Sequence, residues 1–271
     1  MIVDAIKKNV NREVLSSDEA SQAMKEIMSG SATPSQISAF LISLSMKGES
    51  IEEIVALAKT MKEFANRINP THESRLVDIV GTGGDRIKTI NLSTISAFVL
   101  AASGITIAKH GNRAATGKCG SADVLDRLGY RLDTEPEKVR ESIERNGIGF
   151  MFAPIFHPAM KNVIGTRKEI GVRTIFNILG PLTNPASADS MIVGVANTEL
   201  VDKYSKILPE LGCKRAIIVH GLDGLDEIAT FGETKMRFIG DLENEGNHVG
   251  ICNTVTNISI FNFIKYEGRI N

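Results

Sequence analysis

The feature that most constrains the fold is a series of short apolar segments that each lead into a cluster of small polar residues. Four such clusters lie between residues 81 and 123: Gly81-Thr82-Gly83-Gly84-Asp85, Asn91-Leu92-Ser93-Thr94, Lys109-His110-Gly111-Asn112-Arg113 and Gly120-Ser121-Ala122-Asp123. Each cluster lies where a strand is expected to give way to a helix. Glycines at such a point allow positive φ and close approach of a ligand to the backbone, and the amides of a helix N-terminus attract anions. The pattern indicates a phosphate-rich substrate.

The surrounding sequence predicts an α/β fold with a largely parallel sheet. Apolar segments of strand length occur at residues 76–80, 105–108, 148–153, 191–196 and 215–220. Helical patterns lie between them, at residues 93–103 and 121–128, and a capping pattern at 134–137 predicts a further helix. Strands that alternate with helices are typical of parallel sheets.

The first seventy residues predict a small all-helical domain. Capping-box patterns occur at residues 16–19, 33–36 and 50–53. Ile37, Phe40, Leu41 and Leu44 repeat at helical spacing, so this segment needs a partner to pack against. We expect a helical domain at residues 1–70, an α/β domain at 74–157 and 185–250, and an atypical tail at 251–271.

Composition excludes several classes of protein. The net charge of −1 gives no sign of a nucleic-acid footprint, which would need a strong basic excess on one face. No apolar run approaches the length of a membrane span, and the N-terminus lacks the pattern of a signal peptide. The three cysteines are far apart without metal-ligand spacing, which is typical of reduced cytoplasmic thiols. We expect a cytoplasmic protein with neither a membrane nor a nucleic-acid partner.

Several of the polar motifs also have a purely structural interpretation, which the sequence leaves open. The glycines after residue 80 match neither the G-x-G-x-x-G fingerprint nor a Walker lysine, and a tight turn would explain them. Either Ser93 or Thr94 is suited to an N-cap, but also to a phosphate oxygen or Mg²⁺. Lys109 is suited to a diphosphate or to a solvated basic loop. His110 alone is typical of a hydrogen-bonded structural histidine.

Two further candidates lie later in the chain. Asp226 and Glu227 are adjacent carboxylates in a glycine-bearing loop after a strand, which suits either Mg²⁺ or a solvated acidic turn. Arg167 can hold a carboxylate through two parallel hydrogen bonds, or form a surface ion pair.

Together these motifs resemble the anthranilate phosphoribosyltransferases over about residues 1 to 240. The matching stretches also include Asp78-Ile79-Val80, Arg173-Thr174-Ile175-Phe176-Asn177, the run from Gly180 to Pro185, and Gly224-Leu225-Asp226-Glu227. The resemblance implies that residues 158–184 return to the helical domain and that this domain forms a homodimer. It also implies Mg²⁺ and two small-molecule substrates, phosphoribosyl diphosphate and anthranilate, whose amine receives the phosphoribosyl group.

The resemblance also implies roles for individual residues. Those expected to bind phosphoribosyl diphosphate are Gly81, Gly84, Asp85, Thr89, Asn91, Leu92, Ser93, Thr94, Lys109, His110, Gly111, Asn112, Arg113, Ala114, Ala115, Thr116, Gly117 and Ser121. Those expected near anthranilate are Gly81, His110, Asn112 and Arg167, with Arg167 on its carboxylate. Ser93, Asp226 and Glu227 would place Mg²⁺, and Lys109, Asp226 and Glu227 would act in catalysis.

The chain departs from the family pattern in two places. The serines that usually follow the Asn112-Arg113 pair are replaced by a run that includes Thr116 and Gly117. The segment after residue 250 is rich in Asn, Ile and Phe, and we expect it to come from a frameshift or a gene fragment that leaves a sheet edge and apolar helix faces uncovered. One alternative to an active transferase is an inactive truncated family member. Another is a non-catalytic homologue that binds nucleic acid or a partner.

Overall fold

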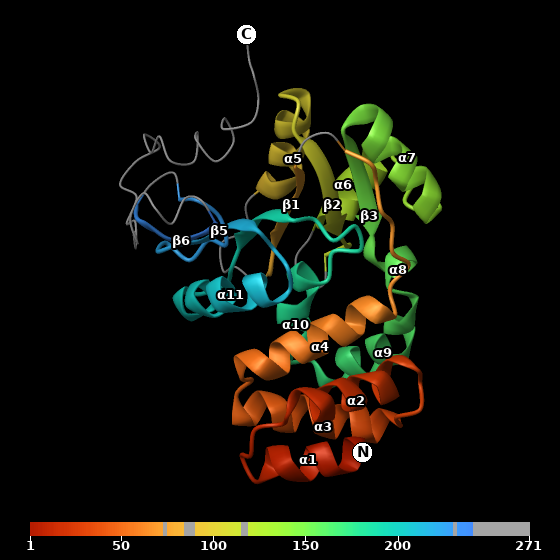
Figure 1. The fold of residues 1–271 in the computed structure, drawn as a ribbon, viewed down its shortest axis with the longest axis vertical. Helices are drawn as coiled ribbons and strands as arrows, with labels where there is room; N and C mark the ends of the chain where they lie inside the picture. Colours follow the sequence, from red (N-terminus) through yellow and green to blue (C-terminus); the bar gives the residue numbers. More distant parts are fainter. Residues whose placement is uncertain (73–74, 84–89, 115–118, 230–231, 241–271) are drawn as a thin grey trace. The chain divides into compact units, whose positions relative to one another are not determined.

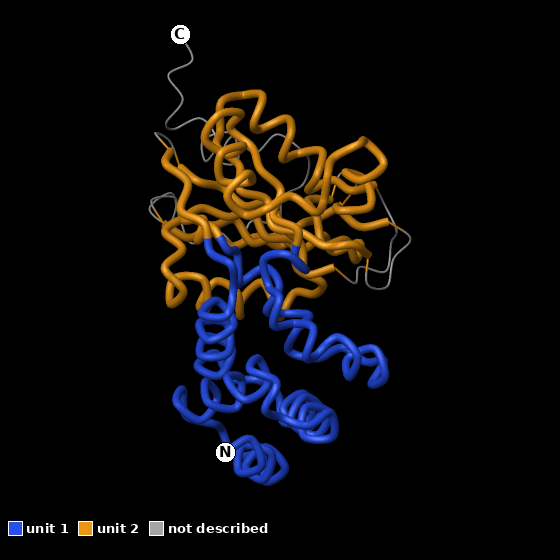
Figure 2. Tube along the Cα trace, turned by 90° about the vertical axis from the view of Figure 1, so that its right-hand side faces the viewer, with its two compact units in different colours: residues 1–67, 153–185 blue, residues 68–152, 186–271 orange. Residues whose placement is uncertain are grey.

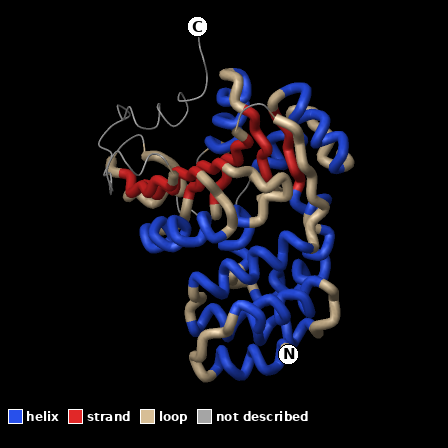
Figure 3. Tube along the Cα trace, in the orientation of Figure 1, coloured by secondary structure: helices blue, strands red, loops and turns tan. Residues whose placement is uncertain are grey.

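The computed structural model describes residues 1–72, 75–83, 90–114, 119–229 and 232–240. The expected atypical tail lies outside these residues. The chain divides into two compact units: unit 1 comprises Met1–Arg67 and Ala153–Pro185, and unit 2 comprises Ile68–Phe152 and Ala186–Asn271 (Figure 2). Helices make up unit 1, and the strands belong to unit 2 (Figure 3). The expected fold class, a small helical domain with a larger and mostly parallel α/β domain, is confirmed.

Unit 1 contains seven α-helices within the described residues, with short 3-10 helices at Pro158–Met160 and Gly180–Leu182. The α-helices are α1 (Ile2–Val10), α2 (Ser17–Met28), α3 (Pro34–Lys47), α4 (Ile51–Glu63), α8 (Ala153–Phe156), α9 (Lys161–Ile170) and α10 (Phe176–Leu179). All three capping boxes form, because Ser16, Thr33 and Ser50 each accept a hydrogen bond from the amide three residues later. The helical spacing of Ile37, Phe40, Leu41 and Leu44 produces the buried face of α3.

A buried ion pair ties together the first part of unit 1. The Glu53 carboxylate is enclosed and accepts the Lys47 ammonium at 2.5 and 2.6 Å. It also accepts the backbone amides of Leu15 and Ser50, both at 2.8 Å. A buried charge is stable only when it is paired and fully hydrogen-bonded, and these four contacts meet that condition.

Unit 2 contains a six-stranded sheet with the strand order β3-β2-β1-β4-β5-β6. The strands are β1 (Leu76–Gly81), β2 (Thr106–Gly111), β3 (Ile148–Phe152), β4 (Ser190–Gly194), β5 (Arg215–Gly221) and β6 (Thr234–Ile239). Strands β1 to β5 are parallel, and β6 pairs antiparallel with β5. The sequence predictions did not include β6, which alternates charged and apolar residues as an edge strand with one buried face does.

Four helices pack on this sheet, as Figure 1 shows. Helix α5 (Leu92–Ala102) contacts β1 and β2, α7 (Pro136–Asn146) contacts β3, and α11 (Thr198–Glu210) contacts β5 and β6. The short α6 (Ser121–Arg127) packs Ala122 and Leu125 against Phe150. The capping pattern expected at 134–137 is wrong, because the N-cap of α7 is Glu135 and the Thr134 hydroxyl donates to the Arg131 carbonyl instead.

The parallel strands place their carboxyl ends along one edge of the sheet. Strand β1 lies between β2 and β4, so the strand order reverses at the β1–β4 pair, where Gly81 is in register with Gly194. In open α/β sheets ligands bind beyond the carboxyl ends of the strands at such a reversal. Among the described residues, no helix has the length and apolar character that a membrane span requires.

Candidate active site

The glycine-rich turn after β1 meets the acidic loop after β5. The Gly83 amide donates to the Asp226 carboxylate (Oδ2) at 3.0 Å, although the two residues are 143 positions apart. A Cβ added at Gly81 would lie 2.8 Å from the same oxygen, and one added at Gly194 would overlap the Asp226 carbonyl oxygen. Both glycines are therefore required by the close approach of Asp226 to the ends of β1 and β4. The structural interpretation of Asp226 as part of a solvated turn is wrong, since its side chain is buried.

Lys109 is a buried strand residue and does not lie in a solvated loop. Strand β2 continues through Gly111, because residues 107–111 all pair with β3. The Lys109 ammonium donates to the Ile79 carbonyl at 2.6 Å and to the Ser93 hydroxyl at 3.2 Å, and the residue is 4% exposed. Burial lowers the pKa of Lys109 to about 8, and the negative charges of Asp78 and Glu227 partly oppose that shift.

The alternation of side chains along β2 separates Lys109 from His110. Helix α5 packs through Ala97 on Val77, Ile79 and Ile107, and Lys109 is two residues beyond Ile107. Lys109 therefore lies on the α5 face, and the neighbouring His110 side chain lies on the opposite face. The His110 backbone amide donates to the buried Asp78 carboxylate at 3.2 Å.

The N-terminus of α5 brings the polar cluster at residues 91–94 next to Lys109. The helix begins at Leu92, and its N-cap is Asn91, which makes no side-chain capping bond. Neither Ser93 nor Thr94 is the N-cap, so that interpretation is wrong. The Ser93 hydroxyl accepts from Lys109, and the Thr94 hydroxyl is buried without a hydrogen-bond partner among the described residues.

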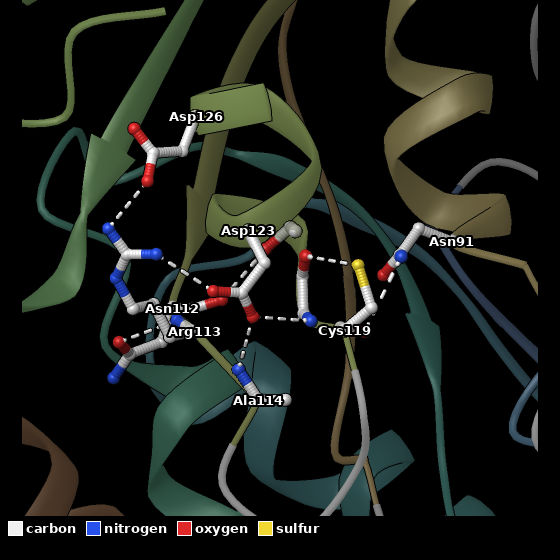
Figure 4. A network of polar contacts seen from close by, with 9 residues as sticks. Asn91, Asn112, Arg113, Ala114, Cys119, Asp123 and Asp126 are labelled. Atoms are coloured by element: carbon white, nitrogen blue, oxygen red, sulfur yellow. Dashed lines mark hydrogen bonds and ion pairs between the residues drawn. The ribbon is translucent and has the colours of Figure 1, made fainter. Parts of the chain in front are cut away.

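The polar cluster after β2, which includes Asn112 and Arg113, contacts the cluster at the start of α6, which includes Ser121 and Asp123. The Asn112 carbonyl accepts the Ala122 amide at 3.2 Å and the Ser121 hydroxyl at 3.3 Å. The Arg113 guanidinium pairs with both Asp123 and Asp126 at 2.9 Å (Figure 4). The side chain of Arg113 is thus held by two carboxylates of unit 2.

Several of the predicted site residues remain as sequence predictions. Gly84, Asp85, Thr89, Ala115, Thr116 and Gly117 lie outside the described residues. Arg167 belongs to α9 of unit 1, where its guanidinium lies 5.2 Å from the centre of the Phe176 ring and burial lowers its pKa. The contacts above form two groups within unit 2. Gly81 and Gly83 lie against Asp226, and Ser93 bonds Lys109, on which the charge of Glu227 also acts.

Three residues that shape this region have no individual role among the sequence predictions: Asp78, Gly194 and Asp123. Asp78 had a visible signal, because it is a charged residue inside an apolar strand. Gly194 had no such signal in the sequence. A glycine is required there because Asp226, which is distant in the chain, lies where a Cβ would be. Asp123 was part of a recognised cluster, but its partner Ala114 is nine residues away.

Both units match known family models. The description "Glycosyl transferase family, helical bundle domain" applies to residues 3–65, and "Glycosyl transferase family, a/b domain" applies to residues 73–249. Among curated relatives, an anthranilate phosphoribosyltransferase from Persephonella marina is 51% identical over 86% of this chain and 69% of its own length. One from Methanocorpusculum labreanum is 53% identical over 89% of this chain and 71% of its own length.

Solved structures show the same similarity. Anthranilate phosphoribosyltransferase from Thermus thermophilus has a TM-score of 0.83 and 46% identity, covering 88% of this chain and 71% of that one. The enzyme from Saccharomyces cerevisiae, solved in complex with PRPP (phosphoribosyl diphosphate) and Mg, has a TM-score of 0.81 and 31% identity, covering 87% and 69%. The chain therefore spans about seven tenths of the length of these relatives.

Proposed function

The chain belongs to the anthranilate phosphoribosyltransferase family, and on that premise we propose that it transfers the phosphoribosyl group of phosphoribosyl diphosphate to the amine of anthranilate in tryptophan biosynthesis. The products are N-(5-phosphoribosyl)anthranilate and diphosphate. The observation that carries this proposal is a pair of contacts in one parallel sheet: Gly83 bonds Asp226, and the buried Lys109 bonds Ser93 and feels the charge of Glu227. The net charge of −1 provides no electrostatic footprint for the nucleic-acid-binding alternative.

We assign the diphosphate to the Lys109 end of this region. Lys109 carries its positive charge at pH 7, because its pKa is about 8. Its ammonium is held by Ile79 and Ser93, so the cation is positioned before the substrate arrives. The buried Thr94 hydroxyl lies one residue further along α5 and is available to a phosphate oxygen. A fixed cation in a site shielded from water stabilises a developing negative charge more strongly than a mobile cation in solvent does.

The same region has the chemistry that Mg²⁺ needs. Mg²⁺ takes a few oxygen ligands from protein and completes its shell with water and substrate phosphates. Asp226, Glu227 and the Ser93 hydroxyl are oxygen ligands of this kind, and we propose that they hold the ion. Among the described residues, no three His, Cys, Asp or Glu side chains form a closed metal cage. When bound, Mg²⁺ supplies charge neutralisation for the departing diphosphate.

The reaction then depends on charge and position. Loss of diphosphate leaves an oxocarbenium-like centre on the ribose, and Lys109 stabilises the negative charge that departs. The neutral anthranilate amine forms the bond to the ribose carbon as the bond to diphosphate breaks. The nitrogen then releases one proton to water, so no strong base is needed. The placement of the amine matters more, because a held nucleophile turns a two-body encounter into a one-body step. We propose that Arg167 binds the anthranilate carboxylate, with Gly81, His110 and Asn112 nearby.

A fluorescence assay of anthranilate consumption tests the activity. Consumption that requires both phosphoribosyl diphosphate and Mg²⁺ supports the proposal. A folded chain that consumes no anthranilate and binds no phosphoribosyl diphosphate contradicts it.

Arg167→Ala tests the placement of anthranilate. We expect the KM for anthranilate to rise by roughly tenfold or more, since a charged hydrogen bond is lost, while the KM for phosphoribosyl diphosphate changes little. Lys168→Ala, on the next residue of α9, is the control for removing a positive charge from this helix. Equal losses for both substrates would contradict the role of Arg167.

The proposal also covers the oligomeric state and the cellular location of the protein. We propose a homodimer formed through unit 1, which exposes the apolar side chains of Val3 and Val10 on α1, Val14 after it and Met46 on α3. We also propose a cytoplasmic location, because the exposed Cys119 is a free thiol, as is usual in a reducing compartment.

A further inference from the structure

The carboxylate of Asp123 joins two parts of the chain that contribute to the expected phosphosugar site. One oxygen (Oδ2) accepts the Ala114 amide at 3.0 Å and the Gly120 amide at 2.8 Å. The other (Oδ1) accepts from the Arg113 guanidinium at 2.9 Å. Figure 4 shows the Ala114 amide and the Arg113 guanidinium directed at Asp123. One side chain thereby connects the segment after β2 to the start of α6.

Helix capping explains only part of this arrangement. Asp123 is the third residue of α6, and a carboxylate there commonly accepts the N-cap amide, which is Gly120. The Ala114 amide does not belong to the helix and has no place in a capping motif. Its bond to the same oxygen is a tertiary contact that a cap would not need.

The neighbouring contacts show what this connection holds in place. The Asn112 carbonyl accepts the Ala122 amide and the Ser121 hydroxyl of the first turn of α6. The Asn91 side chain donates to the Cys119 carbonyl at 3.4 Å. Asn91, Asn112 and Ser121 are among the residues assigned to the substrates, so their mutual positions depend on how these two chain segments meet.

The two segments are in direct contact at Gly120. A Cβ at this position would overlap the Ala114 nitrogen and the Arg113 carbonyl carbon. The amides of Gly120 and Ala114, with Arg113, lower the pKa of Asp123, so the carboxylate is ionised at neutral pH. Hydrogen bonds from amides to a charged oxygen are short and strong, which suits a fixed junction.

We propose that Asp123 is a positioning residue for phosphoribosyl diphosphate, acting by fixing Ala114 and Gly120 against one another so that Asn112 and Ser121 are correctly placed. It does not itself touch the substrate. The inference rests on the proposed function, since it names a residue that serves the same site.

Asp126 offers a matched control, because it pairs with the same Arg113 guanidinium but bonds neither Ala114 nor Gly120. We expect Asp123→Ala to raise the KM for phosphoribosyl diphosphate by about tenfold to a hundredfold, since small misplacements of binding groups have effects of this size. The KM for anthranilate should rise by a smaller factor, because Asn112 is also assigned to anthranilate whereas Ser121 is assigned to phosphoribosyl diphosphate alone. Asp126→Ala should change neither value appreciably. Similar rises in both variants, or no rise in Asp123→Ala, would overturn the proposal.

Asp123→Asn is the second variant, in case Asp123→Ala does not fold. It keeps one oxygen for the two amides but loses the charge that strengthens them. We expect a smaller rise in the same KM, with the melting temperature close to that of the unchanged chain. A KM equal to that of the unchanged chain would contradict the role of the charge and overturn the proposal.

Alkylation of Cys119 provides a measurement that does not require turnover. This exposed thiol adjoins Gly120, and peptide mass spectrometry separates it from the other two cysteines. Phosphoribosyl diphosphate with Mg²⁺ should slow its alkylation in the unchanged chain and in Asp126→Ala, but far less in Asp123→Ala. Equal protection in the unchanged chain, Asp126→Ala and Asp123→Ala overturns the role of Asp123 but leaves the proposed function standing. No protection and no binding in the unchanged chain overturns the proposed function and this inference together.

Discussion

Replacing Lys109 with Met should stabilise unit 2 while it removes binding of phosphoribosyl diphosphate. Lys109 is buried, and its pKa falls from the usual 10.5 to about 8. The folded state therefore holds this charge less readily than the unfolded chain does. A charge that is kept in place against this penalty is better explained by function than by stability.

The size of the effect follows from the pKa. A fall of this size, at about 1.4 kcal/mol for each pKa unit, costs the folded state about 3 kcal/mol at pH 7. The pKa already includes the contacts of the charged ammonium. Met keeps the length of the side chain and loses in addition only the bonds that a neutral amine would make to Ile79 and Ser93, which together contribute about 1 kcal/mol. The expected net gain in free energy of unfolding is about 2 kcal/mol at pH 7.

The pH dependence has a definite sign. Between pH 8 and 10.5 the unfolded chain binds a proton at Lys109 that the folded chain does not, so the stability of the unchanged protein rises with pH in this window. The Met variant has no such group. Its advantage should therefore shrink from about 2 kcal/mol at pH 7 to about 1 kcal/mol at pH 9.

Urea unfolding followed by tyrosine fluorescence measures the difference in free energy of unfolding between Lys109→Met and the unchanged chain, and it reports on unit 2. The chain has no Trp, and its three Tyr residues (Tyr130, Tyr204 and Tyr266) all belong to unit 2. Lys235→Met is the control, because the Lys235 ammonium bonds Asp202 at 2.6 Å and its removal should not stabilise the protein. A Lys109→Met variant that is no more stable at pH 7, or whose advantage grows with pH, would refute the reasoning.

The other predictions concern both units. Burial lowers the pKa of His157 to about 4, so the unfolded chain binds the proton more readily below pH 6.5. Urea unfolding followed by helical circular dichroism should show unit 1 losing up to about 3 kcal/mol between pH 6.5 and 4, and His157→Gln should reduce that slope. Glu53→Gln leaves the buried Lys47 ammonium without its countercharge and should cost about 3 to 5 kcal/mol, measured as a fall in melting temperature. Gly194→Ala forces Asp226 away from β4 and should raise the Mg²⁺ concentration needed for activity, whereas Gly165→Ala on α9, where an added Cβ meets nothing within 4 Å, should not. Val10→Asp should shift the sedimentation of the protein towards a monomer without unfolding it, and unchanged sedimentation would argue against a dimer through α1.

Much of the fold could be predicted from the sequence because it depends on local rules. The capping boxes at Ser16, Thr33 and Ser50 form as their spacing predicts, and the apolar segments become β1 to β5. The polar clusters at strand ends follow from the same rules, since the carboxyl ends of parallel strands share an edge. Edge strand β6 was missed because its alternating pattern is short and carries charges on one face.

The chemistry of the candidate site was decided by the tertiary structure. The burial of Lys109 comes from α5 and from Ile79, thirty residues earlier in the chain, and this burial sets its pKa. The contact between Gly83 and Asp226 joins loops 143 residues apart. The sequence determined which residue types stand at the strand ends, because propensity and periodicity act over a few neighbours. Desolvation, charge and steric contact act through space, so only the folded chain determined which of those residues share a site and in what ionisation state.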